Sequence, residues 1–509
     1  MPSIPGEEMM AQTGVPGLDE VLAGGLAVGH VYLLEGNPGT GKTTIALRFI
    51  LEGASRGERG LFIVLSETER ELRETAASHG WAIDANTQIF EAAPAESLLD
   101  QEQQQTLLYS SELELGETIK SILSAFEKAQ ADRVVLDSLS EIRLLAQNSL
   151  RYRRQLLAIK HYFARRRATV LLLDDLTSDA NDKTVHSVAH GVIQLEELPT
   201  TYGGARRRLR VSKYRGRSFR LGYHDYSIQT GGVSVFPRLV AAEHRTRFAR
   251  TQITSGLVEL DALLGGGLEK GSSTLVLGPA GAGKSTFAIS FLSTAVQQGE
   301  KATMFVFDEE LGLLFDRMKK LGVDLERMQA DGSLFVQQVD AAEMSPGEFS
   351  YLVRSMVDRA QAKSVLIDSL NGYAAAMPDE KALILHVHEL LQYLNRQGAN
   401  TFLTVAQHGI FGDMKVPVDI TYLADTVILL RYFEAAGRVN RAVSVIKKRM
   451  GGHETTIREF NITDAGLQVG DPITHFRGIL RGYPAGEAAP AIDPADASWR
   501  IPNSAPSAP

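Results

Sequence analysis

Gly36-Asn37-Pro38-Gly39-Thr40-Gly41-Lys42-Thr43 has the pattern G-x-x-x-x-G-K-[ST] and stands in a context that suits it. The apolar run 31–34 before it is typical of a buried strand, and the pattern of residues 45–50 after it favours a helix. A second copy, Gly278-Pro279-Ala280-Gly281-Ala282-Gly283-Lys284-Ser285, lies between the strand-like run 274–277 and the helix-like run 286–289. Because strand, loop and helix recur together, both copies are predicted to be phosphate-binding loops.

The residue types in these loops indicate how a nucleotide would be held. Glycines let the backbone curl so that successive N–H groups converge on a phosphate, and the following helix adds its positive end. Lys42 and Lys284 are expected to reach the β- and γ-phosphates, while the hydroxyls of Thr43 and Ser285 ligate Mg²⁺. The residues expected to bind ATP are Gly36, Gly39, Thr40, Gly41, Lys42, Thr43 and Thr44 in the first loop, and Gly278, Gly281, Ala282, Gly283, Lys284, Ser285 and Thr286 in the second.

The two loops belong to a longer internal repeat. Gly24-Gly25-Leu26 matches Gly266-Gly267-Leu268, and Lys42 matches Lys284, at a spacing of 242 residues (284 − 42 = 242). Further along, two Asp-Ser-Leu segments are offset by 231 residues (368 − 137 = 231), so the first half carries 11 extra residues (242 − 231 = 11). We assign the extra residues to the polar stretch 96–109, which is typical of a solvated loop. The chain is therefore a tandem duplication.

Strand-like and helix-like segments alternate in each half, which predicts an α/β fold with a mostly parallel central sheet covered by helices on both faces. Apolar runs without alternation, such as 170–173 and 427–430, suit strands buried on both sides. A Lys-x-Arg motif is expected to close each half, at Lys213-Tyr214-Arg215 and at Lys447-Lys448-Arg449. The expected divisions are an N-terminal domain at 1–235, a linker at 236–252, a C-terminal domain at 253–480 and an Ala/Pro-rich disordered tail at 481–509.

Acidic residues follow the apolar strands at the edge of the sheet where a ligand would lie. Asp137 and Asp368 end strands downstream of a complete phosphate loop, which predicts that each holds Mg²⁺. Hydrolysis also needs an acceptor that polarises the attacking water. Glu67 and Glu309 are the favoured bases in their halves, and Asp308 is a second candidate.

Composition excludes several kinds of protein. A chain of 509 residues is too long for one hydrophobic core, and it contains no cysteine, which rules out disulfides, thiolate zinc sites and a cysteine nucleophile. No uninterrupted apolar run is long enough to span a bilayer, and the N-terminus lacks the features of a signal peptide, so a cytoplasmic location is expected. The net charge of −8 argues against broad affinity for nucleic acid.

Several of these features together resemble the KaiC family of circadian clock ATPases and autokinases. They are the paired loops, the acids at Ser66-Glu67 and Asp308-Glu309, the Asp-Ser-Leu strand ends and Ile457-Arg458-Glu459-Phe460. The resemblance runs from about Thr13 to Leu480. It implies two tandem RecA-like P-loop domains and a homohexamer of two stacked rings that binds ATP between neighbouring subunits.

The resemblance also implies activities. The N-terminal ring would hydrolyse ATP, and the C-terminal ring would act as a serine/threonine autokinase with autophosphatase potential, in clock-type or signalling timing. Lys213, Arg215, Lys447 and Arg449 would act in trans on a neighbour's γ-phosphate, where a cation offsets developing charge. By alignment on Ala424-Asp425-Thr426-Val427, the phosphoacceptor positions are Thr421 and Tyr422, the second of which is a phenol instead of an aliphatic hydroxyl.

Two departures from the family pattern bear on this assignment. Ser66 replaces the first of two glutamates, which leaves Glu67 alone and predicts slower hydrolysis in the first ring. Asp308 replaces the glutamate that serves the family as base for the phosphorylated hydroxyl. A KaiB-type regulator is compatible with the resemblance. A KaiA-type partner is not expected, because the tail after about Leu480 differs from the family's regulatory peptide.

Two other functions remain as alternatives: a RecA-like DNA-dependent ATPase and a signalling scaffold assembled by nucleotide. The basic residues Arg206, Arg207, Arg208, Arg210, Arg217 and Arg220 bear on the first. We expect them to line a subunit interface or face solvent, and nucleic acid is not the expected partner because aromatic residues alternate with them only loosely. His386 and His388 are spaced i, i+2, which places them on different faces of a helix and argues against a metal site.

Overall fold

The computed structural model divides the chain into two compact units. The first comprises Met1–Glu243, Asp340–Arg359 and Ala375–Pro378, and the second comprises His244–Val339, Ala360–Ala374 and Asp379–Pro509. The residues described within them are 9–92, 107–176, 184–199, 202–377, 379–407, 420–435, 437–464, 466–474, 476, 477, 479, 485 and 486. Most of the expected loop at 96–109 and most of the expected tail lie outside these residues, although 107–109 already belong to a helix.

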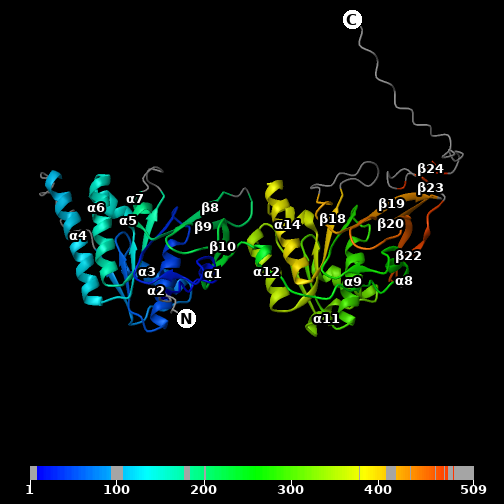
Figure 1. Cartoon of the computed structure of the whole chain (residues 1–509), viewed down its shortest axis with the longest axis horizontal. Helices are drawn as coiled ribbons and strands as arrows, with labels where there is room; N and C mark the ends of the chain where they lie inside the picture. Colours follow the sequence, from blue (N-terminus) through cyan, green and yellow to red (C-terminus); the bar gives the residue numbers. More distant parts are fainter. Residues whose placement is uncertain are drawn as a thin grey trace, which may run out of the picture. The chain divides into compact units, whose positions relative to one another are not determined.

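The first unit alternates strands and helices in the expected way (Figure 1). Its elements are β1 Met10–Ala11, α1 Leu18–Val21, β2 Leu26–Ala27, β3 Val31–Gly36, α2 Lys42–Ser55, β4 Gly60–Val64, α3 Glu69–Ser78, β5 Thr87–Glu91, α4 Leu107–Ala129, β6 Arg133–Asp137, α5 Leu139–Ala146, α6 Ser149–Arg165, β7 Thr169–Asp175, α7 Thr184–Val188, β8 Gly191–Leu198, β9 Arg206–Tyr214, β10 His224–Gln229 and β11 Gly232–Phe236.

The central sheet of this unit contains nine described strands in the order β11-β10-β9-β8-β3-β7-β6-β4-β5. Strands β8, β3, β7, β6, β4 and β5 run parallel to one another, and β9, β10 and β11 continue the sheet beyond β8 in antiparallel pairs. The mostly parallel α/β architecture is therefore confirmed. The expectation that a Lys-x-Arg motif closes each half is wrong. Two strands of the sheet follow Lys213-Tyr214-Arg215, and two follow Lys447-Lys448-Arg449 in the second half. The sequences of β10 and β11 mix polar and apolar residues and carry no motif, so nothing in them indicates that they extend a mostly parallel sheet.

The parallel strands are buried on both faces, and alternate residues face opposite helix layers. Leu34, Phe62 and Leu171 pack in one core cluster with Phe49 and Ile50 of α2. Their chain neighbours Leu33, Leu61 and Leu172 pack in another, whose helical members are Phe126 of α4, Ile142 of α5 and Phe163 of α6. This double burial explains why the strands read as continuous apolar runs.

The segment Asp340–Arg359, which lies late in the sequence, belongs to the first unit. Its helix α12, Pro346–Asp358, contacts β10 and β11. Asp225 of β10 accepts a hydrogen bond from the backbone N–H of Gly347 at 2.8 Å, and Arg206 donates to the carbonyl of Ala341 at 2.5 Å. The antiparallel end of the sheet is thus covered by a helix from the other sequence repeat.

The second unit repeats the same order of elements. Its elements are β12 Gln252–Ile253, α8 Val258–Leu263, β13 Leu268–Glu269, β14 Ser273–Gly278, α9 Lys284–Gln297, β15 Lys301–Val306, α10 Leu311–Lys320, α11 Leu325–Ala330, β16 Leu334–Gln338, β17 Ala362–Asp368, α13 Leu370–Ala375, α14 Glu380–Gln397, β18 Asn400–Ala406, β19 Thr426–Ala435, β20 Arg438–Lys448, β21 Arg458–Thr463, β22 Gly466–Pro472, β23 Phe476–Arg477 and β24 Ala485–Gly486. The sheet order, β16-β15-β17-β18-β14-β19-β20-β21-β22, matches that of the first unit strand for strand.

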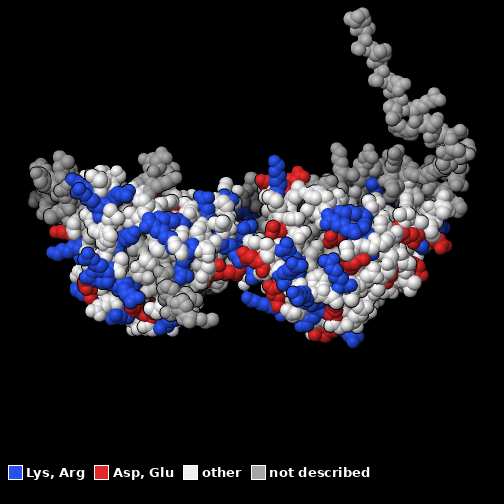
Figure 2. Space-filling model, viewed as in Figure 1, with Lys and Arg blue, Asp and Glu red and all other residues white. Residues whose placement is uncertain are grey.

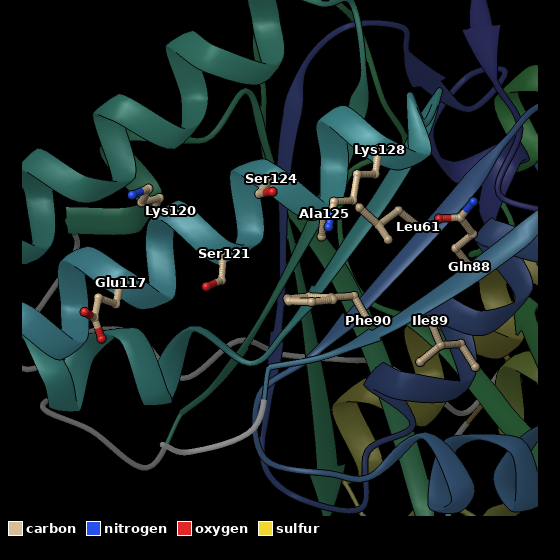
Figure 3. A pocket seen from close by; sticks show the side chains of 10 residues that line it. All are labelled: Leu61, Gln88, Ile89, Phe90, Glu117, Lys120, Ser121, Ser124, Ala125 and Lys128. Atoms are coloured by element: carbon tan, nitrogen blue, oxygen red, sulfur yellow. The ribbon is translucent and has the colours of Figure 1, made fainter. Parts of the chain in front are cut away.

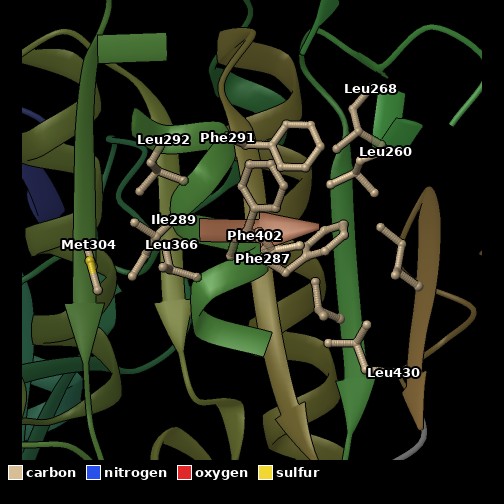
Figure 4. Close-up of a cluster of buried hydrophobic side chains, with 14 of the residues drawn as sticks. Leu260, Leu268, Phe287, Ile289, Phe291, Leu292, Met304, Leu366, Phe402 and Leu430 are labelled. Carbon is tan, nitrogen blue, oxygen red and sulfur yellow. The ribbon is translucent and has the colours of Figure 1, made fainter. Parts of the chain in front are cut away.

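The core of the second unit surrounds α9 (Figure 4). Phe287 and Phe291 of this helix lie 5.6 Å apart between ring centres, and Phe291 also packs on Phe402 of β18. Leu366 and Met304 complete the layer from the neighbouring strands. The phosphate loop ends in the first turn of α9, which begins at Lys284. This packing therefore fixes the position of the helix end at which a phosphate would bind. Within the described residues, no helix is long and apolar enough to cross a membrane.

Candidate nucleotide-binding sites

Each phosphate loop leads from the end of a central strand into a buried helix. Gly41 and Gly283 stand immediately before α2 and α9 in the left-handed region, with φ of 86° and 100°. A Cβ atom on Gly41 would lie 2.7 Å from the side chain of Ile228, and one on Gly283 would lie 2.7 Å from that of Ile462. Backbone conformation and close packing therefore both require glycine at these positions.

The two loop lysines are folded back onto the loop. Lys42 Nζ donates to the carbonyls of Gly36 at 2.8 Å and Asn37 at 3.1 Å, and lies 2.7 Å from Asp175 Oδ1. Lys284 Nζ donates to the carbonyl of Pro279 at 2.9 Å, which is the position equivalent to Asn37. Both lysines are buried, and burial lowers the pKa of Lys284.

In the first unit the hydroxyl and the carboxylate expected at Mg²⁺ are brought together. Thr43 Oγ1 donates to Asp137 Oδ2 at 2.9 Å. Burial raises the pKa of Asp137 to about 6, opposed by the Thr43 hydrogen bond and assisted by the charge of Glu67. A hydroxyl and a carboxylate are hard oxygen donors of the kind Mg²⁺ takes beside nucleotide phosphates. Among the described residues, no group of three or more His, Asp or Glu side chains could hold a metal ion.

Glu67 lies beyond the end of β4, which is the direct neighbour of the β6 strand that carries Asp137. The residue is exposed at the hollow that contains the loop, and desolvation by the surrounding chain, followed by the charge of Glu71, raises its pKa. Together with Ser66, Asp137 and the loop it lines a hollow of about 600 Å³. That volume lies within the range of small-molecule sites.

The second unit arranges its acids differently. Asp368 accepts a hydrogen bond from Thr404 of β18. Asp308 Oδ2 accepts one from Ser369 Oγ at 2.5 Å. Glu309 accepts one from Arg317 of α10 at 2.7 Å, and the same guanidinium donates to Thr286 at 3.3 Å. Asp308 therefore faces a hydroxyl, while Glu309 is paired with a cation.

The two Lys-x-Arg motifs hold equivalent loops in the two units. Lys213 donates to the carbonyls of His186 and Ala189, and Arg215 donates to that of Ser187. In the second unit Lys447 donates to the carbonyls of Thr421 and Ala424, and Arg449 to that of Tyr422. Burial lowers the pKa of both lysines, and a neighbouring arginine adds to the effect.

This arrangement places Thr421 and Tyr422 next to their own chain's Lys447 and Arg449. The side chain of Tyr422 is 53% exposed, and that of Thr421 is partly buried. The segment 408–419 that precedes them lies outside the described residues.

Two arginines of the basic run on β9 form ion pairs across the strand pair. Arg208 lies opposite Glu196 and Arg207 opposite Glu197, with ion pairs of 2.8 Å and 2.9 Å. Arg220 pairs with Glu243 at 2.7 Å. Figure 2 shows Lys and Arg side chains in several separate patches on the visible face of each unit, with acidic side chains among them. His386 Nδ1 lies 2.5 Å from the hydroxyl of Tyr373, within one unit and away from His388.

Three residues near the sites were not identified from the sequence. Asp175 and Arg317 contact a loop lysine and a candidate base. Tyr226 donates to the carbonyl of Thr40 at 2.7 Å and so supports the first loop. The acids that end the apolar run 170–173 could have signalled Asp175 by the strand-end rule applied to Asp137. A second hollow, of about 550 Å³ between β5 and α4, is lined by Phe90, Lys120 and Lys128 among others and contains no motif residue (Figure 3).

The fold and these sites define a duplicated α/β protein with a phosphate loop and strand-end acids in each half. A model of the KaiC ATPase family matches residues 11–240 and again 253–473. The chain is 28% identical over 484 residues to the circadian clock protein KaiC3 of Synechocystis sp., covering 93% of this chain and 94% of that protein. It is 28% identical over 487 residues to the circadian clock oscillator protein KaiC of Parathermosynechococcus lividus, covering 93% and 87%. The chain belongs to the KaiC family.

Proposed function

We propose that this KaiC-family ATPase hydrolyses Mg²⁺-ATP at its first loop and transfers phosphate to its own chain at its second. The observation that carries the proposal is the repeated constellation of buried loop lysine, strand-end aspartate and acid on the neighbouring strand. The acids of the two constellations differ in their surroundings. Asp308 accepts a hydrogen bond from a hydroxyl and Glu309 is paired with Arg317, whereas Glu67 has its pKa raised by desolvation and by the charge of Glu71. The difference favours unequal reactions at the two sites.

At the first site the chain's residues position ATP and its attacking water. The loop N–H groups and Lys42 would hold the β- and γ-phosphates, and Thr43 and Asp137 would hold the metal ion. Bound there, Mg²⁺ would offset part of the negative charge of the phosphates. Glu67, whose pKa burial raises, accepts a hydrogen bond from the attacking water and orients it towards the γ-phosphorus.

At the second site Asp308 is the proposed base for a hydroxyl of the chain. It already accepts a hydrogen bond from Ser369, so its lone pairs are directed at a hydroxyl position. The hydroxyl of Thr421 or Tyr422 gives its proton to Asp308, its oxygen bonds to the γ-phosphorus, and the bond to the bridging oxygen of ADP breaks. Ser285, Lys284 and Asp368 would hold the nucleotide and its metal ion in the same roles as in the first site.

We further propose a homohexamer in which Lys213, Arg215, Lys447 and Arg449 act on a neighbour's nucleotide. In the single chain Lys447 and Arg449 donate to the backbone carbonyls of Thr421 and Tyr422. The proposed acceptors therefore lie beside the proposed trans-acting cations, which supports the proposal. Size-exclusion chromatography with ATP, ADP and no nucleotide tests the assembly. A regulator of the KaiB type is the partner that the family membership favours.

A DNA-dependent motor is less well supported. Arg207 and Arg208 form ion pairs with Glu197 and Glu196 of the adjacent strand. The carboxylates offset the positive charge that would attract a nucleic-acid backbone. We expect single-stranded DNA to leave ATP turnover unchanged.

Intact-mass spectrometry after incubation with Mg²⁺-ATP tests the autokinase directly. We expect added phosphate on the wild-type chain, none on Lys284→Ala, and none on a chain with Thr421→Ala and Tyr422→Phe. Phosphate that persists in the double variant contradicts the acceptor assignment. A wild-type chain that stays unmodified while releasing inorganic phosphate contradicts the autokinase and leaves the hydrolase.

A further inference from the structure

The first nucleotide site holds a carboxylate where the second holds a methyl group. Asp175 ends β7 and lies opposite Gly36, the first residue of the first loop. Ala406 ends β18 and lies opposite Gly278, the first residue of the second loop. The two positions are therefore equivalent, and the two sites differ there by a full negative charge.

Asp175 is bound to the residue that should contact the phosphates. Its Oδ1 lies 2.7 Å from Lys42 Nζ, which also donates to the carbonyls of Gly36 and Asn37. An ammonium group has three N–H donors, so these three oxygens together account for all of them. Lys42 is 9% exposed and Asp175 29%, so the pair is only partly screened by water.

A bound triphosphate must therefore take Lys42 from Asp175 or share it. The hollow that contains the first loop is also lined by Glu67, Asp137 and Arg207. Because Arg207 is already paired with Glu197, the displaced or shared carboxylate stays among other acids. Like charges at a few ångströms in a partly buried site repel strongly, and the repulsion grows as the phosphates carry more uncompensated charge. A divalent cation on the phosphates reduces that charge.

We propose that Asp175 determines the nucleotide affinity of the first site by competing with the phosphates for Lys42, and that it makes this site more dependent on Mg²⁺. The proposal rests on the proposed function, in which the first loop binds ATP. Asp175 acts as an internal anion that occupies the lysine until metal-bound nucleotide replaces it. The second site has no such competitor at the equivalent Ala406.

The experiment uses the full chain with Lys284→Ala, so that only the first loop can bind. Binding of a fluorescent ATP analogue is measured with excess Mg²⁺ and with a chelator instead. We expect Asp175→Asn to tighten binding about tenfold in the chelator, and by a clearly smaller factor with Mg²⁺, because the metal relieves the repulsion. The matched control is Asp84→Asn, which removes one charge from an exposed position before β5. Asp84 lies at the amino ends of the parallel strands, whereas the phosphate loop lies at their carboxyl ends, so Kd should be unchanged.

The reciprocal variant places the carboxylate in the second site. In a chain with Lys42→Ala, Ala406→Asp should weaken binding of the same analogue, again most in the chelator. This gain of a charge keeps the test meaningful if Asp175→Asn unfolds, which circular dichroism would reveal.

Unchanged affinity in both variants overturns the proposal. Weaker binding of Asp175→Asn with Mg²⁺ also overturns it, because that result makes Asp175 a metal-holding residue. If the parent chain with Lys42 intact binds no analogue, nucleotide binding at the first loop is itself contradicted, and the proposal falls with it.

Discussion

Glu309 and Arg317 form an ion pair at 2.7 Å beside the second phosphate loop, whereas the residue of the first unit equivalent to Arg317 is Thr75 (317 − 242 = 75). Thr75 and Glu67 line the same hollow. The two candidate bases therefore have different partners: a guanidinium holds Glu309, and burial raises the pKa of Glu67. The difference arises from one equivalent position in the second half of α3 and of α10.

Removing Arg317 should make Glu309 a better base. In a chain with Lys42→Ala, we expect Arg317→Ala to raise phosphate release at the second site about two- to fivefold, a modest effect because both partners are about one-third exposed. Arg317→Lys keeps the charge and is the control. A slower Arg317→Ala variant would mean that the arginine contacts the nucleotide instead of restraining Glu309.

Glycine at position 41 is expected to be essential for the first site. Gly41→Ala would put a Cβ atom at positive φ and 2.7 Å from Ile228, so we expect about 2 to 4 kcal/mol of lost stability and no nucleotide binding at this loop. Gly39→Ala is the control, because φ is also positive there but no atom lies within 4 Å. Urea unfolding and ligand titration of both variants provide the measurement. Equal losses would show that the contact with Ile228 is unimportant.

Complementation between subunits should reveal whether Lys447 acts in trans. Alone, Lys447→Ala and Lys284→Ala chains should both fail to incorporate phosphate. Mixed hexamers place an intact Lys447 beside an intact second loop, so we expect incorporation at least about tenfold above either variant alone, consistent with the effect of a cation at the γ-phosphate. Mass spectrometry identifies which chain is modified. No recovery in verified mixed hexamers would mean that Lys447 serves only its own loop.

Acid should destabilise the first unit through His224. This ring is 1% exposed, accepts a hydrogen bond from the N–H of Arg238 at 2.9 Å, and lies 3.1 Å from the carbonyl of Arg220. Burial lowers its pKa to about 4, with the nearby arginines adding to the effect. The unfolded chain takes up the proton near pH 6.5 and the folded chain does not, so stability is lost as the pH falls from about 6.5 to 4.

His224→Asn should remove this pH dependence. Between pH 7.5 and pH 5, the wild type should lose about 2 kcal/mol more stability than the variant. Urea unfolding at both pH values measures the difference. An equal loss in the two proteins would show that His224 is not a source of the acid sensitivity.

The sequence by itself determined the features that depend on local pattern. The two phosphate loops, their flanking strand and helix, the duplication and the parallel sheet follow from residue spacing and apolar runs, since these encode backbone conformation and double-sided burial. Strand-end acids such as Asp137 could be placed at the ligand edge for the same reason, because parallel strands end together.

Only the tertiary structure decided which side chains meet. Asp175 and Lys42 are 133 residues apart (175 − 42 = 133), and their ion pair exists because β7 lies beside β3 in the sheet. The contact of helix Pro346–Asp358 with β10 and β11 was also beyond the sequence, since it joins residues as far apart as Asp225 and Gly347, which are 122 positions apart. Spacing along a chain fixes conformation locally, whereas the charge that surrounds Lys42, and so the affinity proposed for the first site, depends on which strands become neighbours.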